Sequence, residues 1–188
     1  MRERGVHVGG AMKAPVLALA VGAALAGGCG KGSIADHDSG PPPSVVTFEL
    51  RNDGIATVYL LQDCLVEYTI TSLADPVHVI HRNAGCGCDC SQTNCPVCGA
   101  CFLGSREIAV GAALNDSWTT EDIINVTRPT GLSCQRSETL PAGPYRIDVP
   151  VYGSDADALA RTSARTATQS FALPAPGDTV TVALGVSP

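Results

Sequence analysis

The sequence has few charged residues and few aromatic residues. Only 16% of its 188 residues are Asp, Glu, Lys or Arg, and only 4% are Phe, Trp or Tyr. About a quarter of an average soluble domain is charged, and coiled coils are richer still in Glu, Lys and Arg. The low charge therefore argues against a coiled coil or a helical bundle, and the abundant Gly, Pro, Ser and Thr favour a β-rich domain.

Basic residues are scarcer than acidic ones. The chain has 12 Lys and Arg against 18 Asp and Glu, which gives a formal charge of -6. Proteins that bind nucleic acids present clustered positive charge to the phosphate backbone. We therefore expect no nucleic-acid partner.

Common catalytic motifs are missing. The chain contains no Gly-x-Ser-x-Gly, no His-Glu-x-x-His and no glycine loop for phosphates or dinucleotides. In the folded part only His78 and His81 could act as general bases, and residues three apart on a strand point to opposite faces. His78 and His81 are therefore not expected to share a site. Because the common catalytic motifs are missing, we expect a protein without enzymatic activity, catalytic residues or a cofactor.

Three acidic residues flank the single tryptophan, Trp118. Two of the residues Asp116, Glu121 and Asp122 could form a carboxylate pair for sugar chemistry, or all three could line a wet loop around a core tryptophan. One aromatic residue among three acids in a turn favours the wet loop.

Long apolar runs are also absent, apart from one near the beginning. The 13 residues Ala14–Ala26 are apolar and follow Lys13. A membrane span needs about 20 such residues, whereas a short apolar run after positive charge is typical of a secretory signal. Residues 1–28 are therefore predicted to be a signal peptide, with either Met1 or Met12 as the true start.

The end of this segment resembles the lipobox of bacterial lipoproteins. The residues are Leu25-Ala26-Gly27-Gly28-Cys29, and the resemblance implies a diacylglycerol group on Cys29. Nine cysteines are present, so a lipid on Cys29 leaves eight for pairing. The resemblance implies a lipid anchor in the bacterial cell envelope, and Gly30 after the cysteine favours the outer membrane. The alternative is cleavage after Ala24-Leu25-Ala26, which would give a secreted protein.

Residues 29–44 then form a polar linker. The stretch Gly30–Ser44 has almost no apolar content and includes Pro41-Pro42-Pro43. Such a composition is flexible or extended, so this segment is predicted to hold the domain away from the lipid surface.

The remaining residues, 45–188, are predicted to form the folded domain. Apolar and polar residues alternate at Val46, Phe48 and Leu50 and again at Val66, Tyr68 and Ile70, which is typical of strands with one buried face. Asn52-Asp53-Gly54 predicts a hairpin turn into a strand at residues 56–62. Further strands are expected at residues 77–82, 107–110, 123–127, 145–151, 170–173 and 179–184. Ser154–Ala167 is expected to be a solvated loop or a short surface helix.

This order of elements indicates an all-β fold, an antiparallel two-sheet sandwich. The chain resembles bacterial immunoglobulin-like modules in Phe48-Glu-Leu-Arg-Asn, the lone Trp118, and Leu140-Pro-Ala-Gly-Pro-Tyr-Arg-Ile followed by a closing strand. It is similar to BsuPI-type proteinase inhibitor domains and to lipoproteins of the myxobacterial type. Those inhibitor domains are not rich in cysteine, so the resemblance implies the immunoglobulin-like fold and not protease inhibition.

A cysteine-rich segment, residues 83–104, is inserted in this fold. It contains six cysteines, and two more lie far outside it; the eight are Cys64, Cys86, Cys88, Cys90, Cys95, Cys98, Cys101 and Cys134. In an exported chain an even number of cysteines predicts four disulfides. Three nested bridges within the segment and one long Cys64–Cys134 staple are the expected pairing.

Two other chemistries are open to this segment. Thiolates in Cys-x-Cys and Cys-x-x-Cys spacing suit Zn or Cu, so the residues between Cys86 and Cys101 could bind metal. Cys95-Pro-Val-Cys98 resembles the redox motif of glutaredoxins but lacks their βαβ context. The favoured hypothesis is a disulfide-stabilised structural or binding module with no metal, which meets a protein or other envelope partner through the segment.

Overall fold

The computed structural model describes residues 44–82, 87–92 and 99–185. Residues 1–28, Cys29, residues 30–43 of the linker and Cys86, Cys95 and Cys98 lie outside the described residues. In the described part the secondary structure is mostly β-strand, which confirms the predicted all-β fold class. The strands are β1 Val45–Arg51, β2 Val58–Gln62, β3 Thr69–Ser72, β4 Val79–Ile80, β5 Gly104–Ile108, β6 Ala113–Thr119, β7 Glu121–Thr127, β8 Ser133–Thr139, β9 Gly143–Val151, β10 Arg165–Leu173 and β11 Thr179–Ala183. One short helix, α1, covers Asp155–Ala160, and a 3-10 turn covers Pro176–Asp178.

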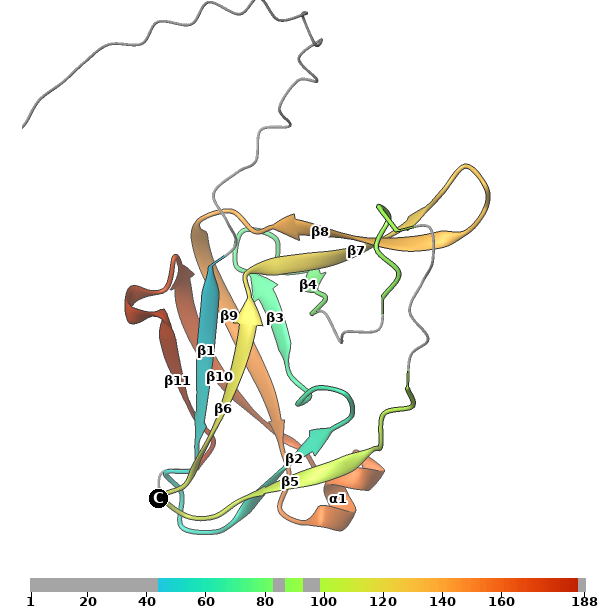
Figure 1. Ribbon diagram of the computed structural model, residues 1–188. Coiled ribbons are helices and arrows are strands. Elements are labelled where there is room, and N and C mark those ends of the chain that lie inside the picture. Colours follow the sequence, from blue (N-terminus) through green and yellow to red (C-terminus); the bar gives the residue numbers. More distant parts are fainter. Residues whose placement is uncertain (1–43, 83–86, 93–98, 186–188) are drawn as a thin grey trace, which may run out of the picture. The chain divides into compact units, whose positions relative to one another are not determined.

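The strands form two larger and two smaller sheets (Figure 1). One larger sheet has the order β11-β1-β6 and the other has the order β10-β9-β3-β4, while β2 pairs with β5 and β7 pairs with β8. Most pairs are antiparallel, as expected, but β11 runs parallel to β1, with Phe48 opposite Val180. The parallel pair arises because the chain leaves β10 in one sheet and enters the other sheet beside β1.

The core lies between the two larger sheets. Val46, Phe48 and Leu50 of β1 are fully buried, and so are Ile147 and Val149 of β9. The predicted alternation of buried and exposed residues in β1 is confirmed. Apolar side chains at every second position of facing strands give each sheet one continuous apolar face, and burial of these two faces stabilises the sandwich.

The predicted hairpin after β1 is wrong. β1 pairs with β6 and β11, and β2 pairs with β5. The buried Asn52 side chain explains the turn: its Nδ2 donates to the carbonyls of Ala56 and Ile108, both at 2.9 Å, and its Oδ1 accepts from the amide of Gly54 at 3.1 Å. These bonds direct the chain away from β1 toward the β2–β5 pair.

The segment after β9 is a helix and then a strand. Ser154 caps α1 by accepting a hydrogen bond from the amide of Asp157 at 3.1 Å, as is usual for serine at a helix N-terminus. The helix is short, as predicted, but β10 begins at Arg165, where a loop or helix was expected. Strands β6 and β8 were not predicted because polar residues dominate both sequences.

Candidate functional site

Two disulfides fasten the cysteine-rich segment to the domain. Cys64 is bonded to Cys101, with Cα atoms 5.0 Å apart, and Cys90 is bonded to Cys134, with Cα atoms 4.9 Å apart. The predicted Cys64–Cys134 staple is therefore wrong, and so are three nested bridges within the segment. Cys88 is also disulfide-bonded.

Strand pairing explains this pattern. Gln62 of β2 lies opposite Gly104 of β5, so Cys64 and Cys101 meet just beyond the end of that pair. Residues 88–90 lie along β8: the amide of Cys90 donates to the carbonyl of Gln135 at 2.9 Å, and the amide of Gln135 donates to the carbonyl of Cys88 at 2.7 Å. The segment is thus joined to two separate sheets, one at each disulfide.

Arg128, between β7 and β8, holds the middle of the segment. Its Nη2 donates to the carbonyls of Asp89, Cys90 and Gln92 at 3.0, 3.1 and 2.8 Å. The Asp89 side chain caps the same turn, because its Oδ1 accepts a hydrogen bond from the amide of Ser91 at 2.7 Å. Hydrogen bonds from the side chain and amide of Ser91, together with the positive charge of Arg128, lower the pKa of Asp89.

Arg82 holds the start of the segment. Its guanidinium stacks 3.4 Å from the centre of the Tyr68 ring, and its Nη1 donates to Oδ2 of Asp116 at 3.0 Å. The Tyr68 hydroxyl donates to the same oxygen at 2.8 Å, and burial raises the pKa of Tyr68. Arg82 Nη2 also donates to the carbonyl of Val66. This cation–π and ion-pair network fixes the chain at the residue that precedes the segment.

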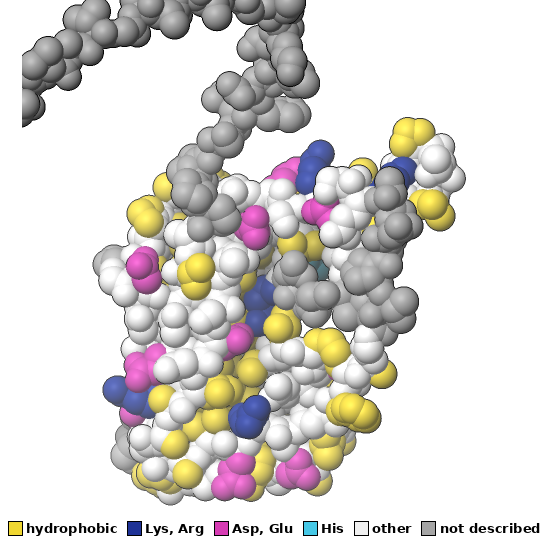
Figure 2. Space-filling view, viewed as in Figure 1, with side chains coloured by type: hydrophobic (Ala, Val, Ile, Leu, Met, Phe, Trp, Pro, Cys, Tyr) yellow, Lys and Arg dark blue, Asp and Glu magenta, His cyan; other side chains and the backbone are white. Residues whose placement is uncertain are grey.

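The end of the segment exposes apolar side chains. Phe102 is 92% exposed and Leu103 is 51% exposed, directly after the bonded Cys101. Leu132, at the tip of the β7–β8 hairpin, is also exposed, and Figure 2 shows hydrophobic side chains at this projecting tip. Apolar groups on a segment fixed by covalent bonds are candidates for contact with a partner.

The acidic residues near Trp118 do not line a loop. Asp116 lies in β6 and Asp122 in β7, and the Trp118 ring is buried in the core. Glu121 also lies in β7, so the expectation of a wet loop around the tryptophan is wrong for all three acids, although Trp118 is a core residue as expected. The sequence of β6 is mostly polar, and β7, although most of it was expected as a strand at residues 123–127, has no strict period-two alternation.

His78 and His81 share a partner, contrary to the prediction that they would point apart. Nε2 of His78 lies 2.5 Å from Oδ2 of Asp122, and Nδ1 of His81 lies 3.6 Å from Oδ1 of the same carboxylate. Strand β4 is only two residues long, so both histidines lie outside it and are free of its alternation. The hydrogen bond with Asp122 raises the pKa of His78.

In the described residues, one group of three residues has potential metal-ligand atoms close together. A carboxylate oxygen of Asp63 and the sulfurs of Cys64 and Cys101 lie within 4.8 Å of one another. Metal binding by cysteine requires thiolates, and these two sulfurs are bonded to each other. The disulfide therefore explains their proximity.

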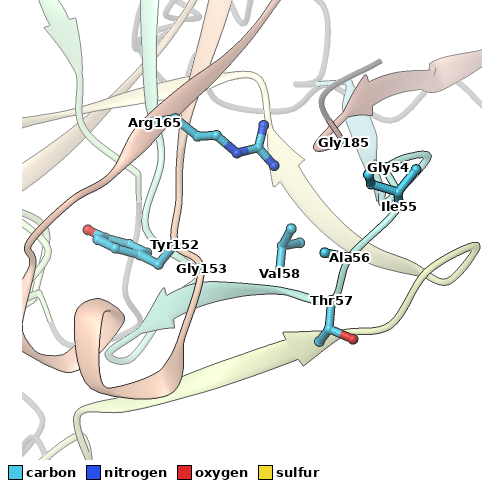
Figure 3. Close-up of a pocket in the computed structure, with 9 residues that line it drawn as sticks. All are labelled: Gly54, Ile55, Ala56, Thr57, Val58, Tyr152, Gly153, Arg165 and Gly185. Carbon is cyan, nitrogen blue, oxygen red and sulfur yellow. The ribbon is translucent and has the colours of Figure 1, made fainter. Parts of the chain in front are cut away.

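A shallow pocket lies at the other end of the sandwich, beside the turn that follows β1 (Figure 3). Its volume is about 200 Å³, smaller than the pockets that usually hold small-molecule ligands. Arg165 extends across it toward Gly185 and donates a hydrogen bond to the carbonyl of Leu184. This bond gives the arginine a structural role.

Comparisons with protein-family models, with curated proteins and with solved structures found no match. Among the described residues there is no helix that is long and apolar enough to cross a membrane.

Proposed function

We propose that this chain is a non-enzymatic lipoprotein of the bacterial cell envelope, anchored through lipid on Cys29, whose sandwich domain binds a protein partner through the cysteine-rich segment. The observation that carries the binding role is the attachment of the segment by Cys64–Cys101 and Cys90–Cys134 to two different sheets. Binding residues concentrate on loops held by rigid scaffolds. A loop that is already ordered also loses less conformational entropy when it binds.

The exposed Phe102 and Leu103 are the proposed contact residues. Aromatic side chains are enriched at the centres of protein interfaces, where they fill pockets of the partner. Phe102 follows a bonded cysteine and precedes β5, so its backbone is restrained on both sides. The alternative function, metal binding by thiolates between Cys86 and Cys101, is less well supported because Cys88, Cys90 and Cys101 are disulfide-bonded.

Substitution of Cys29 is expected to release the protein from membranes. Cys29→Ala removes the sulfur to which the acyl chains would be attached, and stable anchoring depends on such chains. The fraction of protein in the membrane pellet, together with the intact mass of the extracted wild type, measures this effect. We expect a mass that begins at Cys29 and includes acyl chains, and Ser39→Ala is the matched control. A wild-type mass without acyl chains would contradict the lipid anchor.

A photo-crosslinking residue at position 102 is expected to capture a partner in intact cells. The reference position is Ile55, which is 83% exposed in the turn after β1. We expect one discrete crosslinked product from position 102 and none from position 55, and Leu103→Ser should reduce its yield. No product at position 102, or an equal product at position 55, would contradict the binding role of the segment.

A further inference from the structure

Two histidines converge on one buried carboxylate beside the start of the cysteine-rich segment. The Asp122 side chain is only 5% exposed, whereas the side chains of His78 and His81 are 48% and 66% exposed. Each carboxylate oxygen faces a different imidazole nitrogen, His78 Nε2 at 2.5 Å and His81 Nδ1 at 3.6 Å. The two imidazole nitrogens thus lie beside different oxygens of the same carboxylate.

The backbone holds this arrangement in position. The amide of His81 donates to Oδ1 of Asp122 at 2.8 Å, and the amide of Ile123 donates to the carbonyl of His81 at 2.9 Å. These two bonds tie the chain after β4 to the beginning of β7, so the carboxylate is fixed between the two histidines. The His81 ring is 66% exposed and can rotate about its terminal torsion at little cost.

We propose that His78, His81 and Asp122 form a binding site for a divalent late transition-metal ion such as Cu²⁺ or Zn²⁺. Two imidazoles and a carboxylate are a common ligand set for these ions, with water in the remaining positions. This site lies outside the cysteine-rich segment and does not depend on the proposed function.

The two rings must rotate to reach one ion, because His78, His81 and Asp122 do not each place a ligand atom within 4.8 Å of the others. Ligand bonds of about 2.0–2.2 Å place two ligand atoms of one ion about 3–3.5 Å apart. The 3.6 Å between His81 Nδ1 and Asp122 Oδ1 is near this spacing. The 2.5 Å between His78 Nε2 and Asp122 Oδ2 is shorter than this spacing. An ion that replaces the proton between these two atoms therefore moves the His78 ring outward by about 1 Å. The two ring centres, now 6.4 Å apart, then come closer together around the ion.

The proton is therefore the competitor of the metal. Metal binding releases that proton, because imidazole coordinates in its neutral form. The affinity for metal is expected to fall as the pH is lowered.

Titration of the full-length disulfide-bonded protein with Cu²⁺ alone tests the site. The chain has four histidines, and His37 in the linker provides a matched control. We expect one Cu²⁺ per chain, with nitrogen hyperfine splitting in the electron paramagnetic resonance spectrum. His81→Gln should weaken binding by at least about tenfold, since even changes around a ligand set cost about 10–100-fold. His37→Gln should leave the affinity unchanged.

His81 is exposed, so its substitution is not expected to prevent folding, and circular dichroism can verify this. Asp122→Asn, which keeps the shape of the side chain but removes its charge, should also weaken binding. No binding of Cu²⁺ by the wild type at micromolar concentrations would overturn the proposal. Equal affinity of His81→Gln and the wild type, or an equal loss with His37→Gln, would also overturn it.

Discussion

Replacing Cys90 and Cys134 together by alanine is expected to lower the free energy of unfolding by about 4 kcal/mol. The two cysteines are 44 residues apart in the sequence, and their bond restricts the unfolded chain. Without the bond the unfolded chain gains conformational freedom, while the folded state also loses the link between the cysteine-rich segment and β8. Chemical denaturation of the two oxidised proteins measures the difference, and a change smaller than about 1 kcal/mol would contradict the expectation.

The second disulfide provides a quantitative comparison. Cys64 and Cys101 are 37 residues apart, and the entropy of loop closure depends on the logarithm of loop length. Replacing this pair by alanine should therefore cost nearly the same, also about 4 kcal/mol. If the loss of the Cys90–Cys134 bond cost more than the loss of the Cys64–Cys101 bond, loop closure alone would not explain the stabilisation. Native contacts around Cys90, such as the three hydrogen bonds from Arg128 to residues 89, 90 and 92, would then contribute to it.

The two large sheets could be predicted from the sequence because their strands carry the alternation of a half-buried surface. Val46, Phe48 and Leu50 are buried at every second position, and this pattern needs no knowledge of the partner strand. Which strands pair could not be predicted in the same way. The turn at Asn52 has the composition of a hairpin, yet its side chain bonds to the carbonyl of Ile108, 56 residues away.

The candidate sites depended still more on distant contacts. The cysteine count predicted disulfides, but the partners of Cys64 and Cys134 followed from strand registers that the sequence does not reveal. Arg128 and Arg82 have no local signal, because each is one arginine in a polar stretch and its hydrogen-bond partners lie 16 to 39 positions away in the sequence. The sequence does not distinguish Asp122 from the other acids near Trp118. Its burial depends on the packing of β7 beside the two-residue strand β4, and this packing has no local sequence signal.

The second large effect is expected at Phe48, in the centre of the core. The ring is fully buried and lies 5.4 Å from Tyr68, 6.1 Å from Trp118 and 5.5 Å from Phe171, measured between ring centres. These neighbours come from β6, from β10 and from the chain just before β3. One side chain therefore joins aromatic residues from both large sheets, and the edge-to-face pairs with Tyr68 and Phe171 and the stacked pair with Trp118 add to the energy of burial.

Phe48→Ala is expected to lower the free energy of unfolding by about 3–5 kcal/mol, because it removes buried apolar surface and leaves a cavity between the sheets. Phe48→Leu should cost less, since it restores part of the volume. Val45→Ala in the same strand is the control: Val45 is half exposed, so its substitution should change stability by less than about 1 kcal/mol. Trp118, the single tryptophan, lies against the altered site, and its fluorescence reports unfolding during denaturation. If Phe48→Ala cost no more than Val45→Ala, the aromatic cluster would not be the structural centre of the domain.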